Sequence, residues 1–283
     1  VLTLDINPYE AIVVGSGATG GIAAYTLASQ GIKVLIIEAG PTLNRPQAST
    51  SEPIDTFKRV SGAISKKNKH QRQHPGYWKN NPDLYSDENK YPYSYPKGKP
   101  FLWTQGNQYG GRSLTWGGIT LRLAHEDFHP SSIDGFGPDW PISYNELSPH
   151  YDFVEELIGI YGREDNITQV PNGKYIGEIP LNEKEILFGR SVQEKVNYPF
   201  MQSRGFENNS SKREENWPRS SSIGSSLKEG LKTGNIQILD NHLMESFEID
   251  KTLEKATKIK IVNTIDGSRK ELKCNLIFLC AST

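Results

Sequence analysis

A glycine cluster near the start of the chain has the spacing of a phosphate-binding turn. Residues 15–20 read G-S-G-A-T-G and match G-x-G-x-x-G. In this pattern Gly15 allows a tight turn, Gly17 lets the backbone approach a diphosphate, and Gly20 allows a helix to pack closely on a strand. The free N–H groups at the start of that helix also favour phosphate. The spacing predicts a dinucleotide site, and a glycine-rich turn without a ligand is the alternative.

An acidic residue follows at the distance that this kind of site requires. Glu38 stands at the end of the next apolar run. A carboxylate there accepts hydrogen bonds from the ribose hydroxyls of an adenosine. The same unit serves NAD and FAD, so it does not name the cofactor. We expect this part of the site to consist of Gly15, Gly17, Ala18, Thr19, Gly20, Glu38 and Ala39.

A second glycine-rich segment has residues suited to a planar ring. Residues 106–118 read G-N-Q-Y-G-G-R-S-L-T-W-G-G. Paired glycines allow the backbone to lie flat against a ring system, and hydroxyl side chains can bond phosphate or ring edges. The segment predicts further cofactor contacts, with a pair of structural turns as the alternative. The expected contacts are Gly110, Gly111, Ser113, Thr115, Trp116, Gly117 and Gly118.

The elements that must position these residues begin with a β-α-β unit. Residues 11–14 are a continuous apolar run, typical of a strand that is covered on both faces. Residues 22–30 are rich in alanine and leucine and precede Gly31, a favoured residue after a helix end. Residues 33–39 form a second apolar strand. The two strands should therefore be parallel.

The rest of the chain contains further element signals. Ser143 and Glu146 form a capping box, which predicts a helix toward Ile160 that ends at Gly162. Residues 42–100, which include a basic run at 65–74, predict loops with at most one helix. Residues 220–230 predict a helix, and residues 234–249 predict strands. Residues 258–281 predict a hairpin that turns at Asp266 and Gly267. The hairpin should end in a buried strand, 276–279.

Composition excludes several protein classes. The 32 basic residues nearly balance the 33 acidic ones, so no global field favours nucleic acid. Charged residues at 23% and aromatic residues at 10% are typical of a folded globular protein. No apolar run reaches the length of about 18 residues that spans a bilayer, and no signal peptide is visible. We expect a cytoplasmic location, with the periplasm as the alternative if an export signal has been removed.

Two groups of potential metal ligands are weaker signals. Residues 125–129 read H-E-D-F-H, which matches the zinc motif H-E-x-x-H. That chemistry needs both histidines on one helix face, and Pro130 with the loop-like residues after it argues against such a helix. Cys274 and Cys280 lack the spacing of a zinc site and read as small apolar residues. We expect no metal.

Four segments together resemble the glucose–methanol–choline (GMC) family of flavoproteins. They are E-A-G at 38–40, the glycine-rich segment 106–118, W-P-I-S-Y at 140–144, and the stretch 235–281. These matches are spread along most of the chain and stand in the family's order. The resemblance implies FAD as the cofactor. It places Met244 where the family's backbone meets the adenine, with plain core packing as the alternative, and it adds Ala281 to the expected contacts.

The chain departs from the family pattern at two positions. Arg112 replaces the usual small polar residue, and Trp116 stands where many members have asparagine. The second departure is closer to bacterial pyranose-oxidase-like members. That branch often carries a histidine, joined covalently to the flavin, at the position of Thr115. Since threonine cannot form that bond, the resemblance implies noncovalent FAD.

The resemblance also implies a fold and a reaction. The fold class is α/β: a doubly wound FAD-binding domain from segments 1–45, 96–125 and 216–283, insertion loops at 46–95, and a substrate-side α+β subdomain at 126–215. The reaction is oxidation of an alcohol or sugar hydroxyl, with hydride transfer to flavin N5. The catalytic histidine is expected beyond Thr283, in a C-terminal part that this sequence lacks.

Two other functions remain open from the sequence. One is an NAD-linked Rossmann oxidoreductase, and the other is a non-catalytic FAD-binding subunit. The expected partner is a small alcohol or sugar, without nucleic acid and without a transmembrane segment. The electron acceptor and a homo-oligomeric state remain open.

Overall fold

The computed structural model describes residues 9–43, 52–65, 69–73, 81–206, 217–250, 252 and 255–281. The chain forms two compact units. The first combines residues 1–116 with 215–283, and the second consists of residues 117–214. The predicted division into FAD-binding and substrate-side segments stays a prediction.

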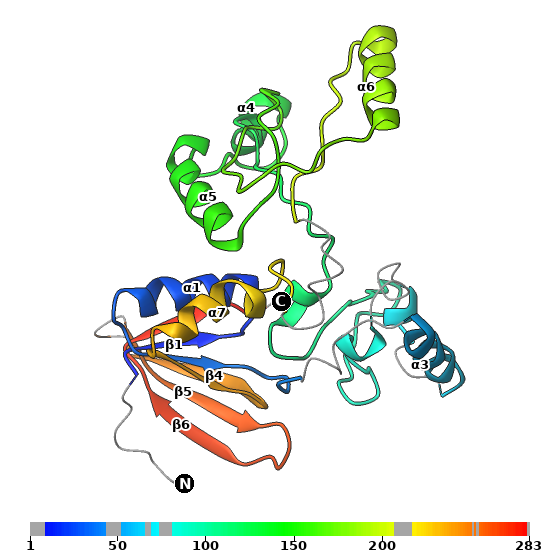
Figure 1. Cartoon of the computed structure of the whole chain (residues 1–283). Coiled ribbons are helices and arrows are strands. Elements are labelled where there is room, and N and C mark those ends of the chain that lie inside the picture. Colours follow the sequence, from blue (N-terminus) through cyan, green and yellow to red (C-terminus); the bar gives the residue numbers. More distant parts are fainter. Residues whose placement is uncertain are drawn as a thin grey trace. The chain divides into compact units, whose positions relative to one another are not determined.

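A four-stranded parallel sheet is the centre of the first unit (Figure 1). Its strands lie in the order β3-β2-β1-β7, and each neighbouring pair is parallel. This confirms the predicted α/β class and the parallel β-α-β unit. The strands are β1 (Ala11–Val14), β2 (Val34–Ile37), β3 (Ile236–Leu239) and β7 (Leu276–Leu279).

Alternation along the central strands creates two cores, one on each face of the sheet. Val13 and Ile36 pack with residues of α1 (Ala18–Ser29) and α7 (Ser226–Lys232). Ile12 and Ile37 pack against a second, antiparallel sheet in the order β4-β5-β6. Figure 1 shows the helices on one side of the parallel sheet and the antiparallel strands on the other. The antiparallel strands are β4 (His242–Asp250), β5 (Lys255–Asn263) and β6 (Arg269–Lys273).

The remaining elements of the first unit are short, apart from one helix. The helix predicted over 220–230 is interrupted at Ser225, whose φ of −132° and ψ of −98° are not helical. The other elements are α3 (Glu52–Ile64), η1 (Gln71–Gln73), η3 (Pro82–Leu84), η4 (Gly111–Leu114) and η7 (Ser222–Gly224). Within the described ranges, no helix is both long enough and apolar enough to cross a bilayer.

The second unit contains the predicted capping box. The Ser143 side chain accepts a hydrogen bond from the Glu146 N–H, and the Glu146 carboxylate accepts one from Ser143 N. The helix ends earlier than predicted because Gly159, with φ of 74°, adopts the left-handed conformation that stops it before Gly162. The helices are η5 (Glu126–Phe128), α4 (Pro130–Asp134), α5 (Tyr144–Ile158) and α6 (Glu183–Val196).

The H-E-x-x-H match spans two separate short helices. His125 precedes η5, and His129 precedes α4. The expectation of a loop after Pro130 is wrong, because proline suits the first turn of a helix and α4 begins there. The break between η5 and α4 still separates the two histidines. Among the described residues no three potential ligands cluster to hold a metal ion.

The prediction that strand 276–279 is buried is wrong for the chain described. β7 is the last strand of the sheet on the side of β1. Leu276 is 50% exposed and Leu279 is 57% exposed. The apolar run correctly indicated a strand, but burial depends on neighbours that a local pattern does not contain.

Candidate nucleotide-binding site

A pocket of about 750 Å³ lies at the carboxyl ends of the parallel strands. Val14, Ile37 and Leu279, the last residues of β1, β2 and β7, all line it. In open α/β sheets, ligands bind outside these carboxyl ends. The location of the pocket therefore follows from the direction of the strands.

The glycine turn after β1 contains two tightly packed positions and one open position. A Cβ at Gly15 would lie 3.0 Å from the Cys280 carbonyl oxygen, and one at Gly20 would lie 1.9 Å from the Gly15 carbonyl oxygen. A Cβ at Gly17 would meet nothing within 4 Å. Gly17 is also the N-cap of α1, where N–H groups have no partner in the helix. The turn thus provides a free space beside amide donors, which fits a diphosphate.

Glu38 is buried beside this turn, and its carboxylate is held by protein donors. Ser16 donates to Oε2 from its N–H at 3.0 Å and from its hydroxyl at 2.5 Å. The Gly40 N–H donates to Oε1 at 2.9 Å. Burial raises the pKa of Tyr109, and the charge of Glu38 raises it further. The sequence identified the acidic residue but not Ser16, which holds it.

Serine hydroxyls attach the second glycine-rich segment to the turn. The Gly110 N–H donates to Ser16 Oγ at 2.8 Å. Ser113 Oγ donates to the Gly110 carbonyl at 2.6 Å and accepts from the Ser222 N–H at 3.0 Å. Ser222 Oγ donates in turn to the Ser16 carbonyl at 2.8 Å. The Ser113 hydroxyl therefore fixes the backbone of the pocket wall.

Most of the predicted contacts converge on this single pocket. Gly20 and Gly110 support its wall, and Thr115 follows η4, but none of the three lines the pocket. Gly117 and Gly118 belong to the second unit. The predicted residues that do line the pocket are Gly15, Gly17, Ala18, Thr19, Glu38, Ala39, Gly111, Ser113, Trp116, Met244 and Ala281.

Several lining residues were not among the predicted contacts. His242 is the clearest case: its buried ring donates from Nδ1 to the Asp240 carbonyl at 2.6 Å. Its Nε2 has no hydrogen-bond partner among the described residues. Its position at the start of β4, two residues before Met244, was the only available signal. The others include Ser16, Trp103, Thr104, Gln105, Asn107 and Arg112.

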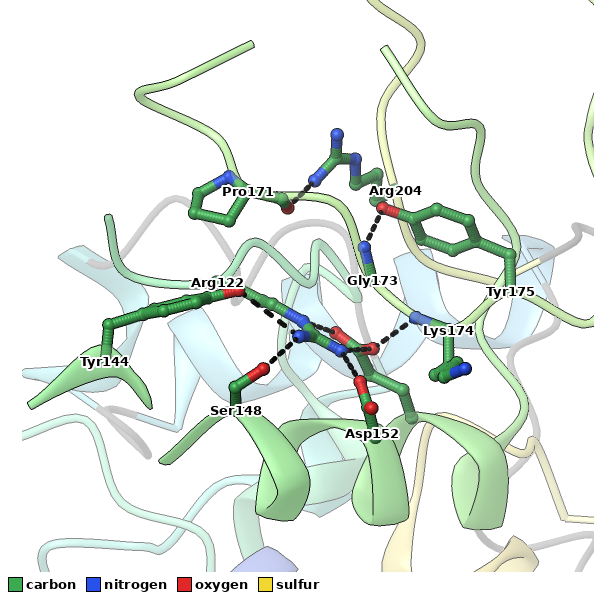
Figure 2. Close-up of polar contacts among 10 residues, drawn as sticks. Arg122, Tyr144, Ser148, Asp152, Pro171, Gly173, Lys174, Tyr175 and Arg204 are labelled. Atoms are coloured by element: carbon green, nitrogen blue, oxygen red, sulfur yellow. Dashed lines mark hydrogen bonds and ion pairs between the residues drawn. The ribbon is translucent and has the colours of Figure 1, made fainter. Parts of the chain in front are cut away.

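The second unit contains a buried charge cluster around Arg122 (Figure 2). Its guanidinium forms two parallel bonds to Glu155, Nε to Oε1 at 2.9 Å and Nη2 to Oε2 at 2.6 Å. It also contacts Asp152 at 2.5 Å, while Glu155 accepts from the Lys174 N–H at 2.6 Å. Burial by itself lowers the pKa of Arg122, but the hydrogen bonds to Glu155 and Asp152 outweigh it and raise the pKa.

A second buried arginine lies in the same unit. Arg204 donates from Nη1 to the Pro171 carbonyl at 2.5 Å. Its Nη2 lies 3.8 Å from Oδ2 of Asp165. Its guanidinium lies over the Tyr175 ring, 5.5 Å from the ring centroid, and the Tyr175 hydroxyl accepts from the Gly173 N–H. Both clusters join α5 or loop segments inside one unit, which indicates a structural role.

Comparison with known families supports the nucleotide-binding geometry. Residues 13–49 match the family model described as NAD(P)-binding Rossmann-like domain. This range contains the glycine turn, α1, β2 and Glu38. The match covers a small part of the chain.

Two characterised relatives extend the similarity. The chain is 33% identical over 168 residues to paromamine 6'-oxidase of Streptomyces fradiae, covering 57% of this chain and 25% of that protein. It is 26% identical over 171 residues to the fructose dehydrogenase large subunit of Gluconobacter japonicus, covering 59% of this chain and 28% of that protein. The matched part of the chain therefore spans about a quarter of each relative.

Solved structures share the fold at low sequence identity. Pyridoxine 4-oxidase from Mesorbium loti aligns with a TM-score of 0.54 and 17% identity, covering 97% of this chain and 49% of that one. A FAD-dependent oxidoreductase from Chaetomium thermophilum aligns with a TM-score of 0.57 and 14% identity, covering 94% and 44%. The chain thus has a Rossmann-type nucleotide-binding unit and shares a larger fold with these two structures.

Proposed function

We propose, from this nucleotide-binding unit and these similarities, that the chain is the N-terminal portion of a FAD-dependent oxidoreductase of the GMC type. The observation that carries the proposal is one pocket formed by both glycine-rich segments. The open face of Gly17 and the backbone of Gly111 meet there, since a Cβ at Gly111 would lie 3.4 Å from Gly17 Cα. Trp116 favours the pyranose-oxidase-like branch, and Thr115, which stands at the position of that branch's histidine, favours FAD held noncovalently.

The chain's own residues would bind and orient the cofactor. The N–H groups after Gly17 would donate to the diphosphate, and Glu38 would accept from ribose hydroxyls. The backbone around Met244 would meet the adenine. The wall of Gly111 and Trp116 would lie toward the ring system. FAD, when bound, accepts hydride at its N5.

We propose that the whole protein oxidises an alcohol or sugar hydroxyl. This rests on the similarity to an oxidase of paromamine and a dehydrogenase of fructose. The catalytic base would be a histidine outside residues 1–283. The length of the relatives supports this placement, because the matched part of the chain covers only a quarter of each.

An NAD-linked oxidoreductase is the second candidate, because the description of the matching family model names NAD(P) as the bound cofactor. The test measures flavin content and its reduction in the purified full-length protein that contains this chain. We expect it to be yellow, with about one flavin per chain, and to lose its visible flavin absorbance anaerobically when one of a panel of sugars and alcohols is added. A colourless protein that binds NAD would favour the second candidate. Bound flavin that no alcohol bleaches would favour a non-catalytic FAD-binding subunit.

A further inference from the structure

We infer that Arg112 supplies the positive charge that binds the diphosphate of the dinucleotide. This inference rests on the proposed function, because it assigns a residue to the same pocket. Arg112 replaces the small polar residue expected from the family pattern, and it lines the pocket.

The backbone places Arg112 directly after the point of contact with the phosphate turn. Gly111 packs against Gly17: a Cβ added at Gly111 would lie 3.4 Å from the Gly17 Cα. The bond from the Gly110 N–H to Ser16 Oγ holds this contact. The guanidinium is also anchored, because its Nη1 donates to the Thr104 carbonyl on another part of the pocket wall.

The described residues around the pocket give the Arg112 guanidinium no anionic partner. Within the described parts of the chain, no carboxylate lies within ion-pair distance of Arg112. Glu38, the carboxylate that lines the pocket, has both oxygens bonded to Ser16 and Gly40. The first turn of α1 also carries no acidic side chain.

An anion is therefore the ligand chemistry that this arrangement fits. A cation in a partly desolvated pocket gains most from an anionic acceptor, and a guanidinium matches phosphate oxygens with several donors. Ala18 and Thr19, the first residues of α1, line the same pocket, and the N–H groups of a helix start have no partner within the helix. Both features favour negative charge next to Gly17, where the diphosphate is expected.

The test measures ADP and adenosine binding to the flavin-free full-length protein and to three variants. We expect Arg112→Gln to weaken ADP binding by about 10- to 100-fold, the range for a charge-assisted bond, and to leave adenosine binding within about twofold. Arg112→Lys should keep more of the ADP affinity at low salt, because it keeps the charge. Arg190→Gln, which removes an exposed arginine of α6, is the matched control and should change neither affinity. Salt should weaken ADP binding more in the wild type than in Arg112→Gln.

Each contrary result identifies a different error. Equal ADP affinity in Arg112→Gln and wild type would overturn the inference. Equal loss of ADP and adenosine binding would also overturn it, because it would assign Arg112 to holding the Thr104 segment. If Arg112→Gln does not fold, Arg112→Lys decides. Reduced ADP affinity with unchanged adenosine binding supports the inference, because lysine keeps the charge but not the several donors of the guanidinium; unchanged ADP affinity, or equal loss of both ligands, contradicts it. A wild-type protein that binds neither ADP nor FAD would instead refute the proposed function, and this inference with it.

Discussion

Gly17 and Gly20 stand in the same turn, yet the structure gives them different tasks. A side chain at Gly17 would enter open space, whereas one at Gly20 would overlap the Gly15 carbonyl, 1.9 Å away. The first glycine is therefore compatible with a side chain in the protein alone, and the second is not. This difference allows ligand binding and folding to be tested separately.

Gly17→Val should remove the flavin without unfolding the protein. Its φ of −65° is accessible to valine, so the cost in folding free energy should be about 1 kcal/mol or less. The valine side chain would occupy the space expected for the diphosphate. The measurements are the flavin content of the purified full-length protein and its thermal unfolding. A variant that keeps its full flavin would refute the assigned diphosphate position.

Gly20→Ala is the matched variant, with the opposite expectation. Its added methyl group must displace backbone, which should cost more than about 2 kcal/mol of folding free energy. Thermal or denaturant unfolding of the two variants, measured side by side, tests this. A Gly20→Ala protein as stable as the wild type would show that the turn can relax, contrary to the packing described.

Thr115 leads to a prediction about how the flavin is held. Threonine lacks the ring nitrogen through which a histidine bonds to a flavin, and Thr115 does not line the pocket. Acid precipitation of the full-length protein should therefore release all of the colour into the supernatant. Flavin that remains in the pellet would show a covalent link and contradict the alignment of segment 106–118 with the family.

Among the elements, α5 is joined to the segment before η5 by a buried ion pair. Arg122 comes from the segment before η5, and its partner Glu155 lies on α5. Both side chains are largely buried, with 3% and 9% of their surface exposed. The pair therefore fixes this helix against the segment that precedes it in the chain.

Arg122→Gln should destabilise the second unit by about 3–5 kcal/mol, because it leaves Glu155 as a buried charge without its partner. The measurement is unfolding followed by circular dichroism or by a tryptophan signal. Lys232→Gln is the control, since it breaks the exposed pair with Glu229 and should have little effect. Equal stability of Arg122→Gln and the control would show that water replaces the lost contacts.

At the edge formed by β7, the first unit exposes apolar side chains that the described residues do not cover. Leu276, Phe278 and Leu279 on β7 are 50%, 37% and 57% exposed, although parallel strands normally have both faces covered. Each large apolar side chain contributes about 1.5–3 kcal/mol when buried, against a total stability of about 5–15 kcal/mol for a domain. Several exposed ones are enough to make the unit marginal.

Residues 1–283 expressed without further sequence should therefore be poorly soluble or poor in flavin. They should also reduce no flavin with any alcohol, because the proposed base lies elsewhere. The assay compares soluble yield, flavin content and anaerobic bleaching with those of the full-length protein. Bleaching by residues 1–283 at the full-length rate would place the base within these residues and refute the proposal.

The sequence by itself determined the elements whose signals are local. The glycine spacing at 15–20, the acidic residue at 38 and the apolar runs around them predicted a parallel β-α-β unit, and the structure confirms it. Ser143 and Glu146 predicted a capping box because its partners are three residues apart. In each case the interacting groups are close in sequence, so the pattern contains the physical cause.

The tertiary structure decided what depends on residues far apart in the chain. It joined Ser16 to Gly110, brought His242 to the pocket, and paired Arg122 with Glu155. It also placed β7 at the end of the sheet, where an apolar strand is exposed. No local pattern encodes these contacts, because each partner is ordinary in its own segment and gains its role only when the fold brings the other to it.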